Sequence, residues 1–248
     1  MKSTMIFAMK KLGLFKPLKQ AKLWREARTR GLMDHYSPFL KKGDLCLDIG
    51  ANMGARSEIF LGLGARVVAL EPQEKCAEFI RSTFDAYPIT VVEKAVGKES
   101  GSATLHFSED SSVLATLSSQ WQNKGRFAGT DSWNKEQTVE VTTLDALIAE
   151  YGLPRFCKVD VEGFEEEVFT GLTHAIPALS FEFTREFIET ASRIIDRLET
   201  LGTYEYNYSI GERHALKLAK WVNKKELFEL LAQESDADLW GDIYARLK

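Results

Sequence analysis

The sequence predicts an α/β fold: a doubly wound, mostly parallel sheet with helices on both faces and one antiparallel strand from a C-terminal hairpin. Three observations lead to this fold class. From Asp44 onward, short apolar runs alternate with segments of helical periodicity, which is the pattern of right-handed βαβ crossovers. The runs are nearly continuous, as expected of strands that are covered on both faces. Near the C-terminus, two runs alternate with period two across a short turn.

The expected strands and helices follow in order along the chain. Apolar runs predict strands at residues 45–49, 67–70, 89–92, 156–161 and 179–183. Two sets of apolar residues between them share helical faces: Ala77, Ile80, Phe84 and Tyr87, and then Ile188, Ala191, Ile195 and Leu198. Residues 204–210 and 214–222 are the expected arms of the hairpin, with its turn at 211–213. Asn223 is expected to cap a last helix.

The chain is expected to hold one domain preceded by a basic arm. Its 248 residues, of which 44% are hydrophobic and 27% charged, suffice for a full core without disulfides or metals. Residues 1–40 are predicted to form a helical extension and residues 41–248 the domain. Residues 1–30 hold nine Lys or Arg against the single acid Glu26, so this segment carries +8 and the remainder −12 of the net charge of −4. An acidic body argues against nucleic-acid binding.

The arm and the cysteines bear on where the protein acts. The basic arm is interpreted as a solvated helix, with contact to an anionic membrane or an acidic partner as the alternatives. No signal-peptide core occurs, and no apolar run approaches the roughly 18 residues of a membrane span. Cys46, Cys76 and Cys157 lack metal-ligand spacing, and so few cysteines are typical of a reducing compartment. The sequence therefore predicts a cytoplasmic protein without a metal site, with membrane-peripheral attachment as the alternative.

Residues 108–137 are expected to form an inserted loop. The stretch contains six serines, two glycines and the tryptophans Trp121 and Trp133, and it has no clear period. Long segments of this kind inside a compact domain often close over a binding site. A surface excursion with a short helix of its own is the alternative, although exposed tryptophans favour a binding role.

A cofactor site is predicted where the first two strands end. The first strand runs into a glycine-rich turn, DIGANMG at residues 48–54, and a helical segment follows at once. Gly50 and Gly54 let backbone approach a ligand closely, and the helix start directs N–H groups at it. The second strand ends in Glu71 and Pro72, where an acidic side chain binds the two hydroxyls of a ribose. A tight turn with a capping aspartate is the structural alternative.

The residues that are missing from this turn narrow the choice of ligand class. Asn52 stands where the dinucleotide fingerprint has its middle glycine, and no phosphate-binding loop with its lysine occurs. The ligand should therefore carry a ribose but no phosphates, and S-adenosylmethionine fits. Asp48 is expected to bind its amine, the helix start its carboxylate, and Asn52 and Ser57 are further polar contacts.

Catalytic residues are predicted at the end of the fourth strand, in KVDVEG at residues 158–163. Strand periodicity places Lys158, Asp160 and Glu162 on one side, and charged groups on an apolar strand are costly unless paired or functional. The first and fourth strands flank the point where ligands bind in open α/β sheets. We expect Asp160 to act on the acceptor proton and Glu162 to orient or bind the acceptor. A Lys158–carboxylate pair that only braces the sheet is the alternative for Lys158.

These motifs together resemble a known family. DIGANMG at 48–54, Glu71 with Pro72, AVG at 95–97, TLD at 143–145 and KVDVEG at 158–163 with Glu165 look like the FkbM-type S-adenosylmethionine-dependent methyltransferases. The resemblance runs from about residue 44 to residue 172. It implies the seven-strand, Rossmann-like methyltransferase fold, with S-adenosyl-L-methionine as the cofactor. It places Glu71 on the ribose-binding acid, and Ala95 and Val96 near the adenine.

The resemblance also implies O-methylation of a hydroxyl on a sugar, glycan or natural product. The acceptor hydroxyl would attack the methyl group in a direct displacement, helped most by the positioning of the reactants. Two other functions stay open. One is an S-adenosylmethionine-binding module that has lost catalysis. The other is a nicotinamide-dependent reductase, against which Asn52 counts.

Overall fold

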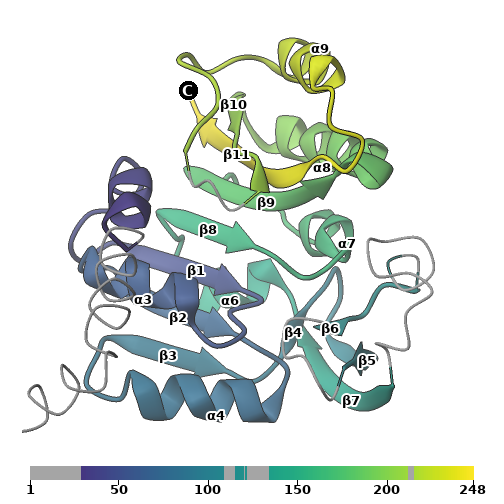
Figure 1. Ribbon diagram of the computed structural model, residues 1–248. Coiled ribbons are helices and arrows are strands. Elements are labelled where there is room, and N and C mark those ends of the chain that lie inside the picture. The colour runs from purple at the N-terminus through teal and green to yellow at the C-terminus, as the bar shows by residue number, and fades with distance from the viewer. Residues whose placement is uncertain (1–28, 109–114, 120, 122–133, 212–214) are drawn as a thin grey trace, which may run out of the picture.

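The predicted parallel sheet is present in the computed structural model, which describes residues 29–108, 115–119, 121, 134–211 and 215–248. Its strands are β1 (Leu45–Ile49), β2 (Arg66–Leu70), β3 (Ile89–Val92), β8 (Phe156–Val159), β9 (Ala178–Thr184), β10 (Tyr204–Tyr208) and β11 (Trp240–Leu247). They lie in the order β10-β11-β9-β8-β1-β2-β3 (Figure 1). All neighbours from β9 to β3 are parallel, whereas β11 runs antiparallel to both β9 and β10. The predicted fold class is confirmed.

Helices cover both faces of this sheet, so the central strands β1, β8 and β9 bury both of their sides, whereas the edge strand β3 is only partly buried. One face is covered by the helical residues 29–36, by α3 (Ala55–Gly62) and by α4 (Glu74–Thr83). The other is covered by α6 (Leu144–Tyr151), α7 (Glu165–Thr170), α8 (Ile188–Leu201) and α9 (Lys224–Gln233). Each face therefore has a hydrophobic core of its own. Neighbouring residues of β1 point into different cores: Cys46 packs in the core of the first face, and Leu47 in the core of the second. This double burial explains why the strands read as continuous apolar runs.

The end of the expected N-terminal extension belongs to the packed core. Leu32, Tyr36, Phe39 and Leu40 are buried in the same cluster as residues of α3 and β1. Aromatic rings dominate the contact, with the Tyr36 and Phe60 ring centroids 5.0 Å apart. Residues 1–28, which carry almost all of the arm's basic residues, lie outside the described residues. The helix and the membrane contact expected of the arm lie outside them too.

The partner strand of the C-terminal hairpin differs from the prediction. β10 pairs with β11, whereas the expected arm at 214–222 contributes one isolated bridge, between Tyr206 and Val222. The Asn207 side chain bonds the backbone of Leu218 instead of a strand ladder, and this holds the segment against β10. The period-two pattern there reflects a segment buried on one side, not a strand. The cap of α9 was predicted correctly, because Asn223 accepts a hydrogen bond from the N–H of Glu226.

A second sheet of four strands stands beside the carboxyl ends of the main sheet and was not predicted as a sheet. It comprises β4 (Ala95–Val96), β5 (Gly101–Phe107), β6 (Ala115–Thr116) and β7 (Lys135–Thr142), in the order β4-β7-β5-β6 (Figure 1). Part of the expected loop at 108–137 is therefore strand. Residues 109–114, 120 and 122–133, including Trp133, lie outside the described residues.

Trp121 is not exposed, contrary to the expectation from its loop-like surroundings. Its side chain is buried and stacks on Phe187, with ring centroids 5.5 Å apart. Phe187 belongs to the short 3-10 helix η1 (Arg185–Phe187) that follows β9, so the stack packs part of the segment predicted as a loop against the main domain.

Among the described helices, none is both long and apolar enough to cross a membrane.

Candidate active site

The site is built where β1 and β8 end side by side. The two strands are parallel neighbours, with Asp48 opposite Lys158 and Ile49 opposite Val159. The backbone turns that follow them approach so closely that a Cβ on Gly50 would overlap the carbonyl oxygen of Asp160. Gly50 also has a φ of +79°, in the left-handed region that favours glycine. The glycine of the predicted turn is therefore required for the two motifs to meet.

A cavity opens at this edge, between the main sheet and the small one. Most of the predicted site residues line it: Gly50, Asn52, Glu71, Pro72, Ala95, Val96, Asp160 and Glu162. The region of the small sheet and the turn after β8 supply apolar walls: Leu105, Ala115, Leu117, Val161 and Phe164. Gln73 and Lys94 add polar groups that the sequence did not single out. The motif predicted to bind the cofactor and the motif predicted to carry catalysis share one cavity.

Glu71 is fixed in place at the end of β2. It is 3% exposed, and its carboxylate accepts hydrogen bonds from the N–H of Asn52 at 2.8 Å and the N–H of Gln73 at 2.9 Å. Burial raises the pKa of Glu71, and these backbone hydrogen bonds oppose the rise because they favour the ionised form. Each oxygen keeps further acceptor capacity, so the side chain is oriented to receive two hydroxyl groups from the cavity.

Asn52 adopts a left-handed backbone conformation, with a φ of +49°. Asparagine tolerates this conformation better than most residues. The turn thereby directs the N–H of Asn52 toward the Glu71 carboxylate, and this hydrogen bond connects the end of β1 with the end of β2 in the cavity wall.

Asp48, Gly54 and Ser57 lie behind the cavity wall instead of on its surface. Asp48 is 1% exposed, and its Oδ2 accepts a hydrogen bond of 2.6 Å from the Ser57 hydroxyl. Burial raises the pKa of Asp48, while Lys158 and Ser57 oppose the rise. A Cβ on Gly54 would lie 2.8 Å from the Phe84 ring, so this glycine permits helix packing. The expected contact of Asp48 with the cofactor amine stays a prediction.

Lys158 is buried and forms an ion pair with Asp160. It is 2% exposed, and its Nζ lies 2.6 Å from Asp160 Oδ2, while the Asp160 side chain is 37% exposed. Burial alone would lower the pKa of Lys158, but the carboxylates of Asp160, Asp242 and Asp48 outweigh it and raise the pKa, so the amine stays protonated. The bracing pair considered for Lys158 is present, and Asp160 nevertheless lines the cavity.

The turn after β8 holds Glu162 in an unusual conformation. β8 ends at Val159, and Glu162 has a φ of +52°, which L side chains rarely adopt and which costs on the order of 1–3 kcal/mol. The Thr116 hydroxyl donates to the Glu162 carbonyl at 2.6 Å, and Glu165 Oε1 accepts from the N–H groups of Val161 and Gly163. Strand alternation therefore does not set the direction of Glu162, and contacts with the small sheet and α7 do.

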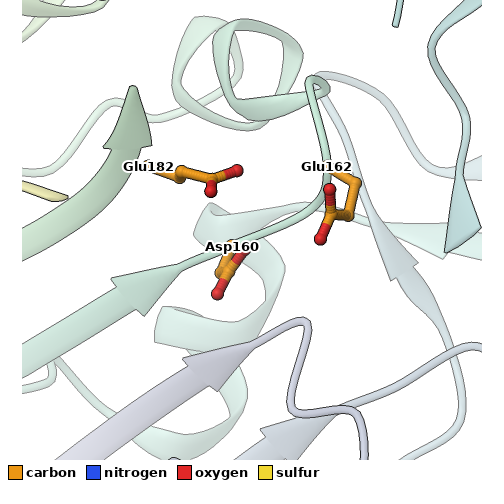
Figure 2. Close-up of side chains that lie close together, drawn as sticks. All are labelled: Asp160, Glu162 and Glu182. Atoms are coloured by element: carbon orange, nitrogen blue, oxygen red, sulfur yellow. The ribbon is translucent and has the colours of Figure 1, made fainter. Parts of the chain in front are cut away.

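A third carboxylate joins the two predicted catalytic ones. Glu182 reaches from β9 toward Glu162 (Figure 2), and one carboxylate oxygen from each of Glu182, Glu162 and Asp160 lies within 4.8 Å of the other two. Glu182 was not predicted from the sequence, although a single acid inside an apolar strand is a signal that could have revealed it. Carboxylates gathered in this way can accept hydrogen bonds from several hydroxyl groups, and oxygen ligands also suit a hard cation.

Comparisons with known proteins identify relatives of this chain. The family model described as Methyltransferase FkbM domain matches residues 48–210. The hexuronic acid methyltransferase AglP of Haloferax volcanii is 29% identical over 164 residues, which make up 64% of this chain and 64% of that protein, so the match spans less than two thirds of the relative's length.

Two solved structures are similar in fold. One is a precorrin-6y C5,15-methyltransferase from Geobacter metallireducens, with a TM-score of 0.47 and 13% identity over 90% of this chain and 88% of that one. The other is a putative RNA methyltransferase from Pyrococcus horikoshii, with a TM-score of 0.44 and 10% identity over 89% of this chain and 83% of that one. The family model covers well over half of the chain. Four of the five motifs on which the resemblance rests contribute residues to one cavity, while residues 143–145 are not among its lining residues. The chain belongs to the FkbM methyltransferase domain family.

Proposed function

We propose that the protein transfers a methyl group from S-adenosyl-L-methionine to a hydroxyl of a sugar or glycan acceptor. The observation that carries the proposal is the meeting of Glu71, Asp160 and Glu162 in one cavity at the carboxyl edge of the sheet. In open α/β sheets, nucleoside ligands bind at this edge, where the strand order reverses. The family supports methyl transfer, while the cofactor and the oxygen acceptor are our inference.

The cavity has the groups that this cofactor needs. Glu71 is buried and held by two backbone N–H groups, so its remaining acceptor sites can bind the two ribose hydroxyls. Ala95 and Val96, with Leu105 and Leu117, give an apolar surface for a flat base. Gly50 and Asn52 of the turn after β1 line the cavity, so the backbone of this turn lies close to a ligand there. When bound, S-adenosylmethionine supplies an activated methyl group.

The acceptor is activated mainly by position. Lys158 holds Asp160 Oδ2 at 2.6 Å and fixes the carboxylate at the edge of the cavity, which leaves Oδ1 for the acceptor hydroxyl. Asp160 orients that hydroxyl and receives its proton as the oxygen reacts. Positioning of the reactants contributes about 7–11 kcal/mol at best, and proton transfer about 10²–10⁴-fold in rate. Glu162, across from Asp160, binds a second hydroxyl of the acceptor.

A sugar is the acceptor class that the relative supports. AglP of Haloferax volcanii is named for methylation of a hexuronic acid, and it aligns over 64% of this chain. Sugars present several hydroxyl groups on a compact ring, and the carboxylates of Asp160, Glu162 and Glu182 offer matching acceptors.

The test is a binding comparison followed by a transfer assay. Calorimetry and thermal shift with S-adenosylmethionine, S-adenosylhomocysteine, NADH and ATP should show binding of the first two alone, since a ligand of the native state raises its apparent stability. Transfer of a labelled methyl group to glycosides should then be detected by mass spectrometry. Binding of NADH in place of the sulfur compounds would overturn the proposal. Cofactor binding without transfer to any hydroxyl would leave a binding module.

A further inference from the structure

The turn after β8 (residues 160–163) carries Asp160 and Glu162, which both line the cavity assigned to the cofactor. Neighbouring elements bind its N–H groups: the Ile49 carbonyl accepts from Asp160, and the Glu165 carboxylate accepts from two further residues of the turn. Glu162 has the left-handed φ of +52°, and such conformations persist where the surrounding structure fixes them. The N–H contacts leave the carbonyl group of Glu162 to be held by another part of the chain.

Thr116 of β6 holds this carbonyl group. Its hydroxyl donates to the Glu162 carbonyl oxygen at 2.6 Å and accepts a hydrogen bond from the N–H of Ser118 at 2.9 Å. Because the hydroxyl donates on one side and accepts on the other, its direction is fixed. Thr116 is 1% exposed, so these bonds are shielded from solvent. The contact joins residues that are 46 positions apart and connects the small sheet with the turn after β8.

The chain that follows β6 contacts the same turn a second time. The N–H of Trp121 donates to the Ser118 hydroxyl at 3.2 Å, and the Trp121 indole lies against Gly163. A Cβ on Gly163 would come within 2.6 Å of this ring, so the contact requires a glycine. Thr116, Ser118 and Trp121 therefore form one connected set of contacts on the turn. Residues 115–121 hold no ionisable side chain, so their effect on the reaction is one of position.

We propose that Thr116 is a positioning residue for methyl transfer: its hydroxyl fixes the peptide of Glu162, and thereby the direction in which the turn after β8 presents Asp160 and Glu162 to the cavity. The inference rests on the proposed function. Thr116 itself moves no proton, because its hydroxyl is engaged by the Glu162 carbonyl and the Ser118 N–H. The small sheet thus supports the reacting edge of the main sheet as well as forming a wall of the cavity.

Two replacements of Thr116 separate the hydroxyl from the shape of the side chain. Thr116→Val keeps the branched shape and removes the hydroxyl. Thr116→Ser keeps the hydroxyl and removes a methyl group. Thr104→Val, at an exposed position of β5, is the matched control, since it makes the same change in the same sheet away from the turn.

Hydrogen–deuterium exchange tests the position of the turn without any acceptor. In the free protein and in protein saturated with S-adenosylhomocysteine, the amides of residues 161–164 should exchange about tenfold faster or more in Thr116→Val, because the turn opens more often. Thr116→Ser and Thr104→Val should exchange as the wild type does. Equal exchange in Thr116→Val and wild type would overturn the inference. Faster exchange throughout the domain, or failure of Thr116→Val to fold, would show a general loss of stability and would overturn it too.

A transfer assay separates positioning of the turn from binding of the cofactor. With methyl glycosides of glucose, galactose and mannose as acceptors, kcat/KM for the acceptor should fall about tenfold or more in Thr116→Val, and Thr116→Ser should recover most of it. Because Thr116 lines the cofactor cavity, Kd for S-adenosylhomocysteine is measured as well and should not change.

The outcomes distinguish this inference from the proposed function. Unchanged kcat/KM in Thr116→Val would overturn the inference. A loss of S-adenosylhomocysteine affinity as large as the loss of kcat/KM would also overturn it, because the hydroxyl would then serve the cofactor. If the wild-type protein binds no S-adenosylhomocysteine or methylates no glycoside, the proposed function fails instead, and the exchange rates decide whether Thr116 positions the turn.

Discussion

The Lys158 ammonium lies 2.6 Å from Asp160 Oδ2, with the lysine almost fully buried and the aspartate at the surface of the cavity. The pair thus connects a buried residue of the sheet with a residue that lines the cavity at the carboxyl edge. β8 ends at Val159, and Asp160 is the first residue beyond it, with its N–H still bonded to the Ile49 carbonyl at 3.0 Å. Lys158 restricts how the Asp160 carboxylate can turn. A group that must be held in position for catalysis is best supported by a side chain that is itself packed in place.

Replacement of the reacting carboxylate tests the catalytic role of Asp160. Asp160→Asn should lower kcat by about 10²–10⁴-fold if the carboxylate takes the acceptor proton. Affinity for S-adenosylhomocysteine should stay within about threefold, since Glu71 remains intact. Asp85→Asn, which removes an exposed acid after α4, is the control. A loss of less than tenfold in a folded protein would leave Asp160 a positioning group only.

Loss of the buried ammonium should be costly for stability. Lys158→Met leaves Asp160, Asp48 and Asp242 without their shared cation, and breaking a buried pair costs about 3–5 kcal/mol. We expect a value near the lower limit, because Asp160 is partly exposed to water. Urea unfolding measures the free energy. The double variant Lys158→Met with Asp160→Asn should regain part of the loss, since one uncompensated charge has gone. Additive losses in the two variants would show that the pair does not interact.

Glu71 should control cofactor affinity. Glu71→Gln removes the charge that strengthens hydrogen bonds to hydroxyl groups, each worth about 1.5–3 kcal/mol, so Kd for S-adenosylhomocysteine should rise about 10- to 100-fold. Calorimetry measures the affinity. Glu74→Gln makes the same substitution at the exposed start of α4, away from the cavity, and should leave the affinity for S-adenosylhomocysteine unchanged. Equal affinities of Glu71→Gln and wild type would place the ribose elsewhere.

Continuous apolar runs mark the strands that the sequence predicted, as expected of strands covered on both faces. β1, which is buried throughout, was predicted to the residue, and so was the edge strand β3, whose residues are only partly buried or exposed. β11 was missed since Gly241 and Asp242 interrupt its run, although Ile243, Tyr244 and Ala245 are fully buried. The small sheet was missed because β4 and β6 have two residues each.

The site was predicted as far as it lies in contiguous motifs. The turn at Gly50, the acid Glu71 and the pair Asp160 and Glu162 each follow a recognisable strand. Glu182 could not be placed in the same way, because its approach to Glu162 depends on how β9 sits beside β8 and on the left-handed turn at Glu162. Both are properties of tertiary packing, which a local sequence pattern does not encode.

Glu165 should give the protein a pH-dependent stability. Burial raises its pKa from 4.5 to about 7, although the N–H groups of Val161 and Gly163 oppose the rise. The folded state therefore holds the proton more tightly than the unfolded chain does. The contribution of Glu165 to the free energy of unfolding is most favourable below pH 4.5 and declines as the pH rises to about 7, with a slope of at most about 1.4 kcal/mol per pH unit.

Glu165→Gln isolates this effect, because glutamine keeps the acceptor oxygen and cannot ionise. Denaturant unfolding of both proteins between pH 4 and 8 gives the difference in free energy. The wild-type protein should lose stability relative to the variant across the window from about pH 4.5 to 7, and the difference should be constant above it. Glu229→Gln, an exposed glutamate on α9, should show no such trend. A difference that is independent of pH would mean that Glu165 ionises normally and that the turn after β8 is held by a charged carboxylate throughout.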